Sequence, residues 1–162
     1  MRNTCLAIAA LAISIPAFAD DTSTTYNTAV TSSYGIMAAA PADFAQAKRE
    51  LAAGRYGSAA LMLERLADGS RDPAVQVLTG FANLGAGKLA RAELYFGRTL
   101  ALDTHSAEAR QGLGLAALAR GDRAGAVAQL AQLEEAQRLC AGKCSRAEAL
   151  GRAVASLKSA LG

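Results

Sequence analysis

The chain has 162 residues, with three cysteines, one histidine, no tryptophan and a formal net charge of +3. A single histidine leaves little material for a histidine-based metal site, and so small a net charge argues against nucleic-acid binding. No apolar run reaches the roughly 18 residues that indicate a transmembrane helix. Alanine (40 residues) and leucine (21 residues) dominate the composition. Because both favour helices, we expect an all-α protein.

Residues 1–19 have the pattern of a secretory signal peptide. Arg2 supplies the positive charge, an apolar stretch covers residues 5–15, and residues 17–19 have the small-x-small form of a cleavage site. Arginine outnumbers lysine 13 to 4, a bias that points to a bacterial source. We therefore expect cleavage before Asp20 and export to the periplasm. The alternative is an N-terminal core helix.

A polar segment, residues 20–39, follows the expected cleavage site. It is rich in Ser and Thr and has neither a helical nor an alternating apolar pattern, which is typical of a flexible tether. Its apolar piece, residues 34–37, has two interpretations. It is either a first turn that leads into the helices or a short segment that docks on the folded domain or on a partner.

The rest of the chain repeats with a period of 34 residues. A shift by 34 aligns Gly80 with Gly114, Gly87 with Gly121, Ala92 with Ala126 and Phe96 with Leu130. An earlier copy fits after a one-residue deletion and contributes Gly54, Ala59 and Leu63. The three copies cover residues 40–72, 73–106 and 107–140.

Each copy divides into two helical stretches around a glycine, at Gly54, Gly87 and Gly121. Glycine adopts the left-handed conformation that ends many helices, so these positions predict turns inside helical hairpins. Asp72 and Ser106 are placed to cap the opening helices of the second and third copies, and Pro73 suits the first turn of the second.

The repeated pattern of an alanine followed four positions later by a large residue, together with Leu113-Gly114, resembles the tetratricopeptide repeat (TPR) family. The resemblance implies a short α-solenoid of three helix-turn-helix repeats. It also implies that the first helix of each hairpin lines a partner-binding groove. The groove residues carried over by register are Phe44, Lys48, Val77, Phe81, Leu84, Gln111, Leu115 and Leu118. The alternative is that these mostly apolar residues are core.

The C-terminal segment, residues 141–162, predicts a further amphipathic helix that caps the third repeat. Its start is marked by a capping box from Ser145 to Glu148, and its apolar residues recur three and four positions apart. A partner-binding helix is the alternative reading of this segment.

The cysteines that remain after the expected cleavage, Cys140 and Cys144, span the preceding turn. We expect a structural disulfide between them. A redox pair is a weaker alternative, because the C-x-x-C spacing and a βαβ context are missing. A metal site is weaker still, because no histidine lies nearby.

The segment from Asp103 to Ser106 contains an acid, a hydroxyl and His105, the residue types of a catalytic triad. Neighbours in one loop cannot take the positions that a triad needs, so a loop with a helix cap is the expected interpretation. No phosphate-binding loop or paired-carboxylate motif is present. We therefore expect no enzymatic activity and no cofactor.

These observations favour an exported, non-enzymatic interaction module, an adaptor or scaffold in cell-envelope assembly or secretion. Its expected partner is a protein or peptide that offers an apolar segment or helix. The alternative is a periplasmic chaperone that binds apolar segments of exported clients. A third class, a redox protein acting through Cys140 and Cys144, predicts that loss of either thiol removes activity without lowering thermal stability.

Overall fold

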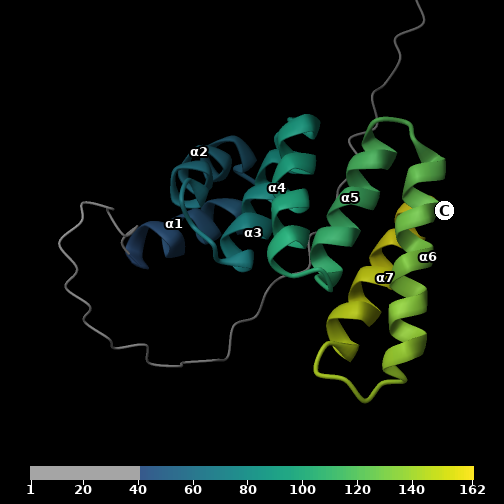
Figure 1. Ribbon diagram of the computed structural model, residues 1–162. Coiled ribbons are helices and arrows are strands. Elements are labelled where there is room, and N and C mark those ends of the chain that lie inside the picture. Colours follow the sequence, from purple (N-terminus) through teal and green to yellow (C-terminus); the bar gives the residue numbers. More distant parts are fainter. Residues whose placement is uncertain (1–40) are drawn as a thin grey trace, which may run out of the picture. The chain divides into compact units, whose positions relative to one another are not determined.

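A computed structural model describes residues 41–162, in which seven α-helices follow one another and no strand occurs (Figure 1). The helices are α1 (Pro41–Ala52), α2 (Tyr56–Ala67), α3 (Pro73–Gly85), α4 (Leu89–Leu102), α5 (Ala107–Ala119), α6 (Arg123–Cys140) and α7 (Ala147–Leu161). The all-α prediction is confirmed for this part of the chain. The expected signal peptide and tether lie outside the described residues. Among residues 41–162, no helix has the length and apolar character needed to cross a membrane.

Each helix packs mainly against its neighbours along the chain. In addition, α5 contacts α3 on one side and α7 on the other. In Figure 1, α7 (yellow) lies beside α5 and α6. The predicted amphipathic helix therefore forms, and its buried face packs against these two helices.

Three turns share one backbone geometry, those between α1 and α2, α3 and α4, and α5 and α6. The glycines Gly54, Gly87 and Gly121 have φ values of 71°, 72° and 83°. At each turn the glycine N–H donates to a carbonyl three residues back, and the next N–H donates to a carbonyl five residues back. This is the Schellman arrangement, which requires a left-handed residue. The predicted glycine turns are confirmed.

Side-chain caps begin three of the helices. Asp72 accepts a hydrogen bond from the Ala74 N–H, and Ser106 accepts one from the Ala109 N–H, as predicted. Asp122 caps α6 in the same way by accepting a hydrogen bond from the Gly125 N–H, which was not predicted.

The predicted capping box at the start of α7 is wrong. Arg146, not Ser145, occupies the N-cap position, and no side chain caps the helix there. The Ala147 N–H donates to the Cys144 carbonyl, which holds the chain in the preceding turn for one more residue. Glu148 instead pairs with Arg152 on the surface of α7.

The core depends on close approach of helices at small residues. The fully buried ring of Phe96, on α4, lies against Gly80 of α3 and Gly112 of α5. A Cβ added at Gly80 would lie 2.5 Å from a ring carbon, closer than Cβ atoms pack in proteins. In the same way, Gly114 of α5 receives Leu157 of α7. Glycine at these positions lets a large side chain fill the space between helices.

Candidate functional site

The eight predicted groove residues lie on α1, α3 and α5, but they do not share one environment. Phe81, Leu84 and Gln111 are buried, with exposed fractions of 6%, 5% and 6%. The other five are half-buried: Phe44, Lys48, Val77, Leu115 and Leu118. Phe81, Leu84 and Gln111 are therefore not open to a partner, contrary to the predicted groove.

Phe81 and Leu84 belong to the core for a clear packing reason. The Phe81 ring meets the Phe96 ring edge to face, with 5.0 Å between centroids and an interplanar angle of 73°. Leu84 lies in the same buried cluster as both rings. An aromatic pair of this geometry stabilises the protein beyond the area that it buries. The alternative left open from the sequence, that such residues are core, holds for these two.

Gln111 is covered by the last helix. Its side-chain amide donates to Ser156 Oγ of α7 at 2.8 Å. This hydrogen bond joins α5 to α7, so Gln111 serves packing in the described chain rather than an open groove.

The five half-buried residues define what we call the first-helix face: Phe44, Lys48, Val77, Leu115 and Leu118. Four of them are apolar. The Lys48 ammonium lies 5.9 Å from the centre of the Phe44 ring, within the range of a cation–π contact. Val77 and Leu115 pack against the core at their inner sides. This face could contact an apolar segment, and its composition offers no general acid–base pair.

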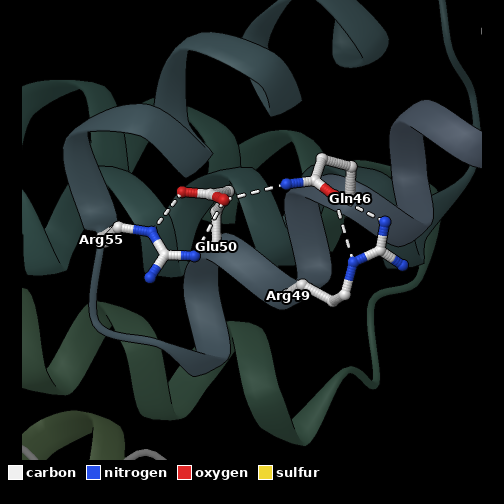
Figure 2. Close-up of polar contacts among 4 residues, drawn as sticks. All are labelled: Gln46, Arg49, Glu50 and Arg55. Atoms are coloured by element: carbon white, nitrogen blue, oxygen red, sulfur yellow. Dashed lines mark hydrogen bonds and ion pairs between the residues drawn. The ribbon is translucent and has the colours of Figure 1, made fainter.

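A polar cluster joins α1 to the turn that follows it (Figure 2). Glu50 accepts hydrogen bonds from Gln46 Nε2 at 2.9 Å and from the Arg55 guanidinium at 2.6 and 2.9 Å. Arg49 donates to the Gln46 amide oxygen on the other side. The Arg55 backbone N–H also donates to the Glu50 carbonyl, so the ion pair reinforces the glycine turn. We assign this cluster a structural role.

The ion pair makes the first hairpin sensitive to acid. The hydrogen bond from Arg55, reinforced by the charge attraction between the two groups, lowers the pKa of Glu50 from 4.5 to about 2 against the opposing effect of burial. Because the pKa is lower in the folded state, Glu50 stabilises the fold fully above about pH 4.5 and loses this contribution as the pH falls toward 2.

We therefore expect Glu50→Gln to be less stable than the native chain at neutral pH, with the difference shrinking between about pH 4.5 and 2. Urea unfolding at a series of pH values measures this difference. If the difference in the free energy of unfolding between the two proteins stays constant down to pH 2, the pKa of Glu50 is not lowered by folding.

The predicted cysteine pairing is confirmed. The sulfur atoms of Cys140 and Cys144 lie at disulfide distance, 2.09 Å. The pair closes the turn between α6 and α7, where Ala141 adopts a left-handed φ of 49° and Gly142 one of 71°. The disulfide thus constrains the chain just before the helix that covers α5.

Reduction of this disulfide, or the double change Cys140→Ser and Cys144→Ser, should lower the free energy of unfolding by about 2 kcal/mol or less, because the closed loop is short. Thermal unfolding with and without reductant measures the loss. The double variant serves as the control, since reductant should not change its melting temperature. An unchanged melting temperature in the native chain would contradict a structural role for the disulfide.

The loop from Asp103 to Ser106 uses its polar groups locally. Asp103 Oδ1 accepts a hydrogen bond from the His105 backbone N–H at 2.9 Å, and Ser106 Oγ caps α5. His105 is exposed. Within residues 41–162, no cluster of three or more His, Cys, Asp and Glu side chains is placed to hold a metal ion.

A hollow beside the disulfide, which we call the C-terminal groove, lies along the second half of α6 and reaches the loops before α5 and α7. Its volume is about 690 Å³. The residues that matter for its chemistry are Arg110, Leu133, Leu139, Cys140, Arg146 and Leu150.

No family model, curated protein or solved structure matches this chain. The roles of its residues therefore come from the geometry alone.

The C-terminal groove and the Glu50 cluster were not predicted from the sequence. One local signal for the cluster existed, because Glu50 and Arg55 flank a glycine turn at a spacing that brings opposite charges together. The groove had no such signal, since its lining comes from three separate segments.

Proposed function

We propose that the chain is a non-enzymatic protein–protein interaction module built from three TPR-like hairpins stacked as a short α-solenoid and closed by α7. The observation that carries the proposal is the threefold repetition of one turn geometry at Gly54, Gly87 and Gly121. The alanine five positions after each of these glycines is fully buried as well. Repeated hairpins that bury their faces against neighbours are the basis of solenoid stability, and solenoids commonly present binding surfaces.

The partner-binding surface in this proposal is the first-helix face. Its four apolar residues are only half-buried, and an apolar segment of a partner would remove them further from water. Lys48 supplies the single positive charge of the face. The expected partner is therefore a protein or peptide with an apolar segment or helix.

The proposed location is the bacterial periplasm, with cell-envelope assembly or secretion as the setting. The signal-peptide pattern of residues 1–19 supports export. A cysteine pair at disulfide distance also suits an oxidising compartment. The amino-terminal sequence of the purified protein tests this: a mature chain that begins at Asp20 is expected, and one that retains residue 1 would contradict export by this signal.

Affinity capture from the envelope fraction tests the interaction module. The full-length gene with a C-terminal tag is expressed in its own host, and retained proteins are identified by mass spectrometry. We expect one or two stoichiometric partners, and we expect the double change Val77→Glu and Leu115→Glu to lose them.

Two controls accompany this capture. Leu61→Glu alters an exposed leucine of α2 (62% exposed) and should retain the partners. Far-UV circular dichroism must show unchanged helicity in both variants. If the double variant unfolds, its residues serve the core, and if it folds and keeps the partners, the first-helix face is not the binding surface.

The second candidate function is a chaperone that shields apolar segments of exported clients. It is favoured by the exposed leucines at positions 61, 94 and 139, which are 62%, 50% and 69% exposed. A chaperone should suppress aggregation of a chemically denatured model enzyme and retain many proteins weakly. An adaptor should do neither.

A further inference from the structure

The C-terminal groove combines an apolar floor with the most exposed leucine of the described chain. Leu139 is 69% exposed, and Leu133 and Leu150 lie deeper in the groove. The exposure has a structural origin, because α6 has 18 residues whereas α2 and α4 have 12 and 14. Leu139 lies in the last turn of this long helix. An apolar surface that stays in contact with water favours a site of interaction.

The rim of the groove carries positive charge that is poorly neutralised. Arg110 donates to the Gln132 amide oxygen and to the Thr104 carbonyl, both neutral acceptors. Among the described residues, the carboxylate that pairs with Arg146 is that of Asp103, at the long distance of 4.0 Å. The acidic side chain of the groove, Glu135, is engaged by Arg138 of the same helix.

These two features together specify the chemistry of a ligand. Guanidinium groups bind carboxylates through paired, charge-assisted hydrogen bonds. An apolar side chain that enters the groove would cover Leu139, which is exposed, and place a neighbouring carboxylate at the rim. The volume of about 690 Å³ is sufficient for two or three side chains.

We propose that the C-terminal groove binds an acidic, apolar peptide segment of a partner protein, with the apolar side chains against Leu139 and the carboxylates against Arg110 and Arg146. This site shares no residue with the first-helix face, although α5 contributes Arg110 to the groove and Leu115 and Leu118 to the face. The disulfide of Cys140 and Cys144 forms part of its wall and fixes the turn that carries Arg146.

A random dodecapeptide library displayed on phage and selected against the purified protein tests the proposal. We expect the selected peptides to combine leucine or phenylalanine with aspartate or glutamate. The best peptide is then synthesised with a fluorescent label, and its Kd is measured by anisotropy. Leu139→Glu and Arg146→Glu should each weaken binding at least about tenfold.

Matched controls isolate the groove from general effects of charge. Leu61→Glu makes the same change at a leucine of similar exposure on α2, and Arg71→Glu reverses an exposed charge in the loop before α3. Both should leave the Kd unchanged. Val77→Glu, a change in the first-helix face at a residue that does not line the groove, should also leave it unchanged, which separates this site from the first-helix face.

Three results would overturn the proposal. The selected peptides could lack the acidic and apolar combination. They could bind the Leu139→Glu variant as tightly as the native chain. Sedimentation could instead show a dimer that Leu139→Glu dissociates, in which case a second copy of the chain, not a peptide partner, occupies the groove.

Discussion

Replacement of Phe96 by alanine should lower the free energy of unfolding by about 3–5 kcal/mol. The ring is fully buried between α3 and α5, and it makes an edge-to-face contact with Phe81. Neither Gly80 nor Gly112 has a side chain that could fill the space left behind, so most of the cavity should remain. Urea unfolding followed by circular dichroism measures the loss.

The neighbouring residue Leu94 provides the control for this substitution. It lies on the same helix but is 50% exposed, so Leu94→Ala should change stability by no more than about 0.5 kcal/mol. Equal effects of the two substitutions would contradict the central position of the Phe96 ring. An unchanged urea unfolding midpoint in the Phe96→Ala variant would also contradict the central position of this ring.

A methyl group added at Gly112 should destabilise the protein by about 1–3 kcal/mol, although alanine is the better helix former. The new Cβ would overlap the Phe96 ring, which also lies in close contact with Gly80 of α3. The ring therefore cannot move without disturbing α3. Thermal and urea unfolding of Gly112→Ala measure the effect.

Gly97 on α4 gives a control of identical chemistry. A Cβ at this exposed helical position would meet no atom within 4 Å, so Gly97→Ala should stabilise the protein by about 0.5–1 kcal/mol. The two Gly→Ala substitutions should thus have opposite signs. If both are stabilising, α5 does not approach the ring as closely as described.

A double-mutant cycle tests whether Gly112 and Phe96 act as a unit. A smaller side chain in Phe96→Leu should accommodate the alanine of Gly112→Ala, so the combined loss should be less than the sum of the two single losses. Additive losses would show that the two sites do not share a contact.

Features that depend on a few neighbouring residues could be read from the sequence. The turn at Gly87 needs only a residue that tolerates positive φ, and the caps at Asp72 and Ser106 need only an oxygen beside the first free N–H groups. The capping box predicted at Ser145 is absent because of the turn that precedes it. The turn closed by Cys144 extends one residue further than the local pattern indicates.

Which residues of the predicted groove are buried and which are exposed could not be predicted from the sequence. A 34-residue period places Phe81 and Leu115 at equivalent positions, yet one is buried and the other half-buried. The burial of Phe81 depends on Phe96, and that of Gln111 depends on Ser156 and the rest of α7. Repeat register predicts which side of a helix a residue occupies, but the neighbouring helix decides its exposure.

The succession of contacts along the chain has a consequence for how the protein folds and opens. Helices α1 to α6 each touch their immediate successor, and the further contacts of α5 reach only the second neighbour on each side along the chain. Such a low contact order favours rapid folding, since few distant segments must find each other. It also predicts a gradient of local opening, because α1 has α2 as its main support whereas α5 is held on several sides. Amide hydrogens of α1 should therefore exchange long before those of α5.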